Sequence, residues 1–151
     1  MLGWRSEEGE PMDSQAFERS VARLRRAERV FVVSGAGISA ESGIPTFRGS
    51  GGLWEGFRAE ELATPQAFAA DPERVWRWYR WRAEQYGDCA PNAGHDTIAA
   101  MASRYRRLLV ATQNVDGLHR RAGSPAVVEL HGSIADMRCT ACDTLAPFPR
   151  G

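Results

Sequence analysis

Short hydrophobic runs at residues 30–33, 108–111 and 127–130 predict three buried strands. The first run ends at Gly35-Ala36-Gly37, and a short helix can open at residues 39–42. Glycine at a strand end lets a ligand approach the main chain, and a helix start presents N–H groups. This pattern predicts a cradle for the pyrophosphate of a dinucleotide. A tight turn without a ligand is the alternative interpretation.

Helical periodicity precedes and follows this first strand. Between Asp13 or Ser14, as N-cap, and about residue 28, apolar residues recur at helical spacing among arginines, which predicts an amphipathic helix that lies against the sheet. The pairs Thr64-Pro65 and Asp71-Pro72 each place a capping residue before proline and predict two further helix starts. Helices that alternate with strands indicate an α/β layered fold.

The helix expected over residues 72–86 carries too many aromatic residues for one core stripe. Some of them are therefore expected to line a groove. Tyr79 and Arg82 are three residues apart and share one helix face. A phenol beside a guanidinium suits a carboxylate. On the pattern alone, a tyrosine at the core edge beside a solvated arginine is the preferred interpretation.

Polar residues follow the second and third strands directly. Gln113, Asn114 and Asp116 come after the second, and His131 comes after the third. In α/β folds such positions, at the carboxyl ends of parallel strands, are where ligands bind. Asp116 can instead cap a following helix, Asn114 can hold a turn, and a lone histidine is more often structural than catalytic.

Composition narrows the class of protein. The 151 residues include 19 basic and 19 acidic side chains, so the net charge is zero and gives no general electrostatic case for nucleic acid or an anionic membrane as partner. The sequence contains no apolar run long enough for a transmembrane helix, and residues 1–12 form a polar leader rather than a secretory signal. We therefore expect a cytoplasmic protein.

Cys139 and Cys142 have the C-x-x-C spacing of half a zinc site. Two thiolates do not saturate a tetrahedral zinc ion, so a redox pair and a coincidental pair remain alternatives.

Four segments together resemble the sirtuins, the NAD-dependent protein lysine deacylases. They are GAGISAESGIPTFRG, an unbroken match over fifteen residues, then PNAGH, TQNVDGLH and VELHGS, in the order of that family. The resemblance implies a Rossmann-like parallel sheet with helices on both faces, followed by the beginning of a small zinc module. It also implies NAD as cofactor and acylated lysine side chains of proteins as substrates.

The resemblance assigns roles to individual residues. His131 is implied as the base for a ribose hydroxyl, while the acyl oxygen attacks the ribose carbon as nicotinamide leaves and the acyl group ends on ADP-ribose. Phe47 is implied to shield the reaction centre, and Arg48 to position the cofactor. The remaining cofactor contacts implied are Gly35, Ala36, Gly37, Ile38, Ser39, Trp54 in a lid extending to about residue 62, Gln113, Asn114, Val115 and Asp116.

Tyr79 and Arg82 fall on the Tyr-x-x-Arg pair of the sirtuins that accept acidic acyl groups. The resemblance therefore reverses the earlier preference and implies succinyl, malonyl or glutaryl lysine as substrates beside acetyl lysine. Cys139 and Cys142 are implied as two of four zinc ligands. We expect a polar leader at 1–12, the N-terminal part of a deacylase domain at 13–134 and half a zinc module at 135–151.

Two other functions stay open at this point. The first is a catalytically inactive sirtuin remnant with a half-built sheet and an exposed edge strand. The second is an ordinary NAD-binding oxidoreductase domain, which the FRG, QNVD and LHG segments disfavour.

Overall fold

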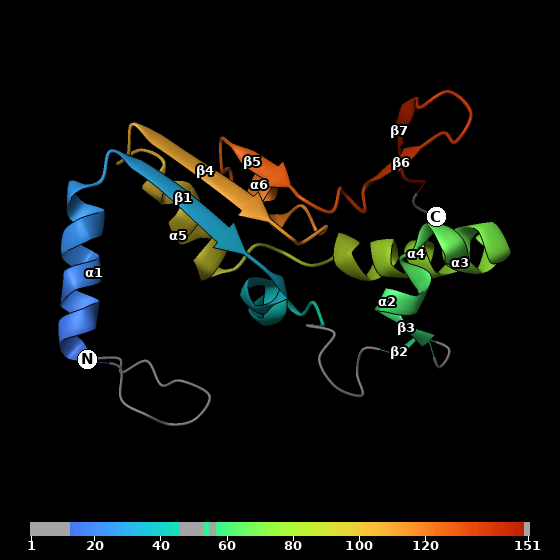
Figure 1. Cartoon of the computed structure of the whole chain (residues 1–151), viewed down its shortest axis with the longest axis horizontal. Coiled ribbons are helices and arrows are strands. Elements are labelled where there is room, and N and C mark those ends of the chain that lie inside the picture. The colour runs from blue at the N-terminus through green and yellow to red at the C-terminus, as the bar shows by residue number, and fades with distance from the viewer. Residues whose placement is uncertain (1–12, 46–52, 55–56, 150–151) are drawn as a thin grey trace.

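A three-stranded parallel sheet forms the centre of the computed structural model, which describes residues 13–45, 53–54 and 57–149 (Figure 1). The strands lie in the order β1 (Arg29–Ser34), β4 (Arg107–Thr112) and β5 (Val127–Glu129). Val32, Val110 and Val127 are partners in one row across the sheet. All three predicted strands and the Rossmann-like parallel arrangement are confirmed.

Helices and two small hairpins make up the rest of the described structure. The hairpins are β2 (Leu53–Trp54) with β3 (Phe57–Arg58), and β6 (Asp136–Arg138) with β7 (Leu145–Pro147). The helices are α1 (Ser14–Arg26), the 3-10 helix η1 (Ala36–Ser42), α2 (Ala59–Leu62), α3 (Pro65–Ala70), α4 (Pro72–Gly87), α5 (Ala93–Met101) and α6 (Leu118–Arg121). Among the described residues, no helix has both the length and the apolar character needed to span a bilayer.

The predicted helix starts are confirmed by their side-chain caps. Asp13 accepts a hydrogen bond from the N–H of Gln15 at 2.9 Å, and Thr64 and Asp71 cap α3 and α4 in the same way. Each cap satisfies an N–H group that has no partner inside its own helix.

The position predicted for the first helix is wrong. α1 ends at Arg26, two residues earlier than expected, and it does not lie against the sheet, since none of its residues is buried. Phe17 and Leu24, on its apolar side, are 52% and 43% exposed. An amphipathic helix gains its stability by covering an apolar surface. The described residues supply no such surface to α1.

Two hydrophobic clusters form the core. One lies between the sheet and α5 and is built on Tyr105, Leu108, Val110 and Val127. The other packs α4 against α6 and the segments after η1 and β5; its buried members are Ile44, Ala83, Tyr86, Leu118 and Ile134. α5 therefore covers one face of the sheet, and the second cluster lies beside the carboxyl ends of the strands.

The segment expected to be a loop to about residue 62 is partly regular. Residues 57–58 form β3, and α2 follows directly, with Leu62 buried. The N–H of Arg58 donates to the carboxylate of Glu61 at 2.8 Å, which ties the strand to the helix. The implied cofactor contacts Phe47 and Arg48, and the side chain of Trp54, lie outside the described residues.

Candidate active site

A cavity of about 1110 Å³ lies between the carboxyl ends of the strands, helix α4 and the β6–β7 hairpin. Its wall combines segments that are far apart in the sequence. The predicted site residues that line it are Ala36 and Ser39, the pair Tyr79 and Arg82, the run Gln113 to Asp116, and His131. Gly35, Gly37 and Ile38 are not in this wall, and their role stays a prediction.

A buried hydrogen-bond network joins the glycine segment to the end of β4. The Ser39 hydroxyl donates to Oδ2 of Asp116 at 2.7 Å and accepts from Nδ2 of Asn114 at 3.0 Å. Nδ2 of Asn114 also donates to the carbonyl of Gly35 at 3.1 Å. Because every donor here has an acceptor, the carboxylate and the amide are held in fixed orientations on the cavity wall.

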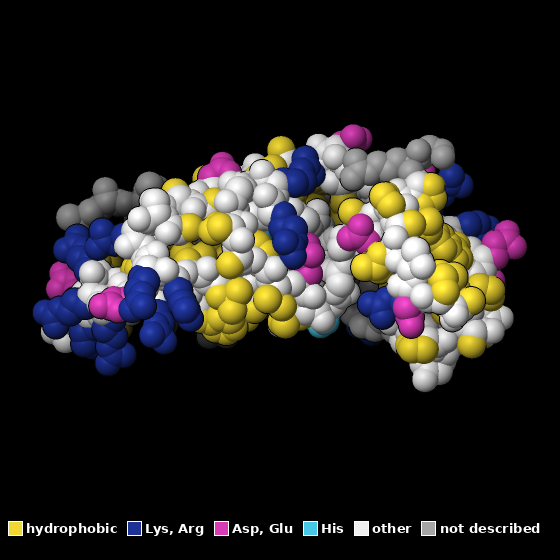
Figure 2. Space-filling view, turned by 90° about the horizontal axis from the view of Figure 1, so that it is seen from above, with side chains coloured by type: hydrophobic (Ala, Val, Ile, Leu, Met, Phe, Trp, Pro, Cys, Tyr) yellow, Lys and Arg dark blue, Asp and Glu magenta, His cyan; other side chains and the backbone are white. Residues whose placement is uncertain are grey.

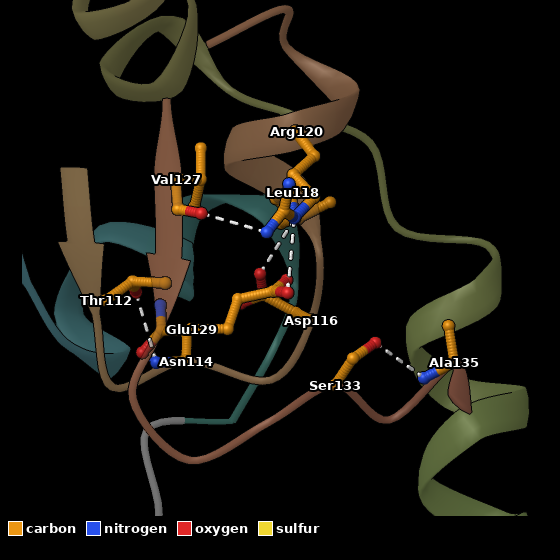
Figure 3. Close-up of polar contacts among 9 residues, drawn as sticks. All are labelled: Thr112, Asn114, Asp116, Leu118, Arg120, Val127, Glu129, Ser133 and Ala135. Atoms are coloured by element: carbon orange, nitrogen blue, oxygen red, sulfur yellow. Dashed lines mark hydrogen bonds and ion pairs between the residues drawn. The ribbon is translucent and has the colours of Figure 1, made fainter. Parts of the chain in front are cut away.

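The local roles considered for Asn114 and Asp116 are also present (Figure 3). Oδ1 of Asp116 accepts from the N–H of Leu118 at 2.9 Å, at the start of α6. The N–H of Asn114 donates to Oγ1 of Thr112 at 3.1 Å, which turns the chain after β4. The Asp116 side chain therefore shapes the backbone and lines the cavity at once, whereas the turn at Asn114 is held by the side chain of Thr112.

The backbone at residues 35–37 differs from the expected order of strand, glycine loop and helix. The helix begins earlier than predicted, at Ala36, and Gly35 is its N-cap without a side-chain cap. A Cβ added at Gly35 or Gly37 would meet no atom of the described residues within 4 Å, so open space lies over the backbone at both positions. This space and the uncapped helix start fit the approach of an anionic group to the main chain.

His131 enters the cavity from the loop after β5, and its tautomer is set by the backbone. Its Nδ1 lies 3.1 Å from the carbonyl oxygen of Gln113. A carbonyl oxygen only accepts, so Nδ1 carries the proton and Nε2 presents a lone pair. The N–H of Gln113 donates to the carbonyl of Ser34, which anchors this contact to β1. An exposed imidazole in this tautomer is suited to act as a base.

Tyr79 and Arg82 both face the cavity, as their spacing predicts. Arg82 is 91% shielded from solvent: its guanidinium lies 4.7 Å from the ring of Trp78, and Nε and Nη2 donate to the hydroxyl of Tyr86 at 3.2 and 3.0 Å. The Tyr79 ring packs edge-on against Trp78, 4.6 Å between centroids. Arg82 is thus a buried, oriented cation rather than a solvated surface residue.

Tyr86 is a site residue that sequence reasoning missed. Burial raises the pKa of its phenol above the usual 10.0, and the negative charge of Asp116 raises it further, while the neighbouring Arg82 opposes both. The phenol therefore stays protonated at neutral pH. The signal was present, since Tyr86 follows Arg82 by four residues and such pairs share a helix face.

Asn92 is a second residue whose role was missed. It caps α5, and its Nδ2 also donates to the carbonyl of Ile38 at 2.7 Å and to the hydroxyl of Ser42 at 2.9 Å. These bonds fasten η1 to the start of α5. No sequence signal connects residues that are 50 or more positions apart in this way.

Two buried histidines lie behind the site, with ring centroids 4.9 Å apart. His95 accepts from the N–H of Asn92 through Nδ1, and Nε2 of His119 contacts the Ser34 hydroxyl at 2.8 Å. Burial lowers the pKa of both rings; Asp116 opposes the shift at each, and the proximity of His95 adds to it at His119. Both histidines are therefore neutral at pH 7 and act as structural residues.

Acidification is expected to destabilise the fold through this pair. In the unfolded chain each histidine titrates near its usual value of about 6.5, whereas the folded chain binds these protons only at lower pH. The stability contributed by the neutral pair is present above that value and is lost as the pH falls. The midpoint of thermal unfolding should drop between pH 7.5 and pH 5.5, with each histidine lowering the stability by at most about 1.4 kcal/mol over this window.

Two variants test whether the buried histidines cause this dependence of stability on pH. His95→Gln should reduce the dependence on pH, and His131→Gln should retain it because His131 is exposed. A thermal midpoint in the unmodified chain that is constant or rises on acidification contradicts the assignment.

Cys139 and Cys142 lie in the β6–β7 loop, and both are exposed. Hydrogen bonds from Thr144, and then from Cys139, lower the pKa of the Cys142 thiol, which favours the thiolate that metals bind. Within the described part of the chain, no group of three or more potential ligands gathers around them. The two thiols alone do not form a tetrahedral zinc site.

The fold and the cavity define an α/β protein with a ligand site at the carboxyl ends of its parallel strands. The model of the Sir2 family matches residues 35–148, and the chain belongs to this family. It is 58% identical over 127 residues to NAD-dependent protein deacylase 2 of Pyrobaculum aerophilum, covering 83% of this chain and 51% of that protein.

A second relative and a solved structure support the same family. The mitochondrial NAD-dependent protein deacylase sirtuin-5 of Canis lupus familiaris is 50% identical over 125 residues, covering 80% of this chain and 40% of that protein. The crystal structure of a Sir2 homologue in complex with NAD superposes with a TM-score of 0.82 at 44% identity, covering 97% of this chain and 56% of that one. The chain thus spans about half the length of the relatives that it matches.

Proposed function

We propose that this chain provides the catalytic cavity of an NAD-dependent protein lysine deacylase that accepts acidic acyl groups. The observation that supports the proposal is the arrangement of the cavity wall. One wall combines a fixed amide and carboxylate, a histidine with a free lone pair on Nε2, and a buried arginine beside a tyrosine. The NAD-dependent relatives and the solved NAD complex of a family member support NAD as the cofactor.

The residues at the end of β1 and β4 fit a dinucleotide. The open space at Gly35 and Gly37 would hold phosphate against uncapped N–H groups, and the amide and carboxylate of Asn114 and Asp116 would orient the ribose and the carboxamide. Ser39 is fully buried and would keep the Asn114 amide and the Asp116 carboxylate in position. When bound, NAD supplies the ribose carbon that accepts the acyl oxygen and nicotinamide as the leaving group.

His131 would remove a proton from a hydroxyl group through Nε2. The carbonyl of Gln113 fixes the tautomer in advance and would also stabilise the ring after it is protonated, because Nδ1 keeps its proton and its acceptor throughout.

The pair Tyr79 and Arg82 would select the acyl group. A guanidinium that is buried and oriented by Trp78 and Tyr86 recognises a carboxylate more strongly than a solvated one, since less water has to be displaced and less rotational freedom is lost. A succinyl, malonyl or glutaryl group ends in such a carboxylate. An acetyl group would enter the same cavity without this interaction.

The test uses a chimaeric protein, here called the completed enzyme, in which this chain replaces the matched region of the Pyrobaculum aerophilum relative. The completed enzyme is incubated with acetyl-lysine and succinyl-lysine peptides, with and without NAD. The proposal predicts deacylation of both only when NAD is present, and faster removal of the succinyl group. Deacylation without NAD, or none with it, contradicts the proposal.

A further inference from the structure

The hydroxyl group of Tyr86 has a proton that the fold does not use. Its oxygen accepts from Nε and Nη2 of Arg82, at 3.2 and 3.0 Å. A phenol also carries one proton of its own to donate. Within the described part of the chain, no side chain or carbonyl group accepts that proton. Because the two guanidinium donors approach the lone pairs of the oxygen, the proton points away from Arg82.

The Tyr86 side chain is buried, yet the residue belongs to the cavity wall. It is 5% exposed and shares a hydrophobic cluster with Ile44, Leu118 and Ile134. The phenol keeps its proton at neutral pH because burial raises its pKa. A buried donor without an acceptor costs free energy, and this cost is removed when a ligand brings an acceptor to it.

The surroundings of this hydroxyl group favour an anionic acceptor. The hydrogen bonds from the Arg82 cation polarise the phenol and make it a stronger donor. Trp76 and Phe148 line the same cavity and stack on each other, 5.1 Å between centroids. In Figure 2 hydrophobic side chains dominate the end formed by α4 and the β6–β7 hairpin, whereas basic side chains gather at the opposite end. Hydrogen bonds to a charged group are strong in apolar surroundings.

We propose that Tyr86 is a third recognition residue of the acyl pocket, beside Tyr79 and Arg82, and donates its hydroxyl proton to the terminal carboxylate of an acidic acyl group. The inference rests on the proposed function, since it requires that Arg82 binds this carboxylate. Tyr86 follows Arg82 by one turn of α4, so one helix supplies all three groups. An acetyl group carries no carboxylate to accept the proton.

The test compares succinyl, butyryl and acetyl groups on one lysine peptide in the completed enzyme. A butyryl group has as many carbon atoms as a succinyl group but no carboxylate, so it separates charge from size. Tyr86→Phe should lower kcat/KM for the succinyl peptide by about 10-fold relative to the other two. The loss should appear mainly in KM, because Tyr86 contacts the far end of the acyl group and not the reacting atoms.

Tyr105→Phe is the matched control. Tyr105 is also a buried tyrosine, but it belongs to the cluster between the sheet and α5 and is not part of the cavity wall. Its substitution should leave the ratios among the three peptides unchanged. Circular dichroism confirms that each variant is folded.

A double variant separates proton donation from the positioning of Arg82. Tyr86→Phe removes the acceptor of the Arg82 donors as well as the phenol proton. In an Arg82→Met background no guanidinium is left to position. Tyr86→Phe should still lower the ratio of succinyl to butyryl removal there, by about 3-fold.

Two results would overturn the inference and leave the proposed function intact. The first is a Tyr86→Phe enzyme that keeps the succinyl to butyryl ratio, including one that loses all three activities equally. The second is a ratio that falls in the single variant but does not change in the Arg82→Met background, which would make Tyr86 a positioning residue only. An unmodified completed enzyme without a preference for succinyl would contradict the proposed function itself and, with it, this inference.

Discussion

Replacing His131 with alanine is expected to lower deacylation by the completed enzyme by about 10²–10⁴-fold, the range typical for loss of a positioned general base. His131 is exposed, so the substitution removes the Nε2 lone pair and the hydrogen bond from Nδ1 to the carbonyl of Gln113 without opening the core. Peptide deacylation at saturating NAD and peptide measures the effect. The loss should appear in kcat, with little change in the affinity for NAD.

Ser133→Ala is the matched control for this variant. Ser133 lines the same cavity two residues further on, and its hydroxyl accepts from the N–H of Ala135 at 3.1 Å (Figure 3). It should stay within a few-fold of the unmodified enzyme. A His131→Ala enzyme that retains such a rate, with its fold intact, would show that His131 is not the base.

Removing the buried cation is expected to change which acyl group is preferred. Arg82→Met should lower the rate of succinyl removal by about 10- to 100-fold relative to acetyl removal, since a hydrogen bond to a charged group contributes about 1.5–3 kcal/mol. Tyr79→Phe removes one hydroxyl and should shift the ratio in the same direction by a smaller factor. The ratio of kcat/KM for the two peptides is the quantity to measure.

Arg77→Met separates this effect from a general loss of positive charge. Arg77 lies on the same helix but is exposed and is not part of the cavity wall. Its removal should leave the succinyl to acetyl ratio unchanged. Equal losses of both activities in Arg82→Met would remove the acyl-pocket assignment and leave Arg82 a structural role with Tyr86 and Trp78.

Features set by neighbouring residues were predictable from the sequence. A capping side chain contacts N–H groups two or three positions away, so Asp13, Thr64 and Asp71 located three helix starts correctly. Each strand ends within one residue of the place where its apolar run stops. Because parallel strands end at one edge, the sequence also indicated that Asn114 and His131 would line a common site.

Features that depend on distant contacts were not predictable. The bond from Asn114 to Ser39 spans 75 residues, and the bond from Asn92 to Ile38 spans 54. The expectation that α1 covers the sheet was wrong because periodicity shows that a helix has an apolar side, but not what that side meets. In this chain it meets no part of the described core.

The most direct test of the account is the stoichiometry of the reaction in the completed enzyme. Nicotinamide release and deacylated peptide are quantified in the same sample, with a succinyl-lysine peptide and NAD in excess. If this cavity transfers the acyl group to NAD, one nicotinamide appears for each acyl group removed, and neither forms without the other. Deacylation that proceeds without nicotinamide release, or nicotinamide release that does not depend on the peptide, would contradict it.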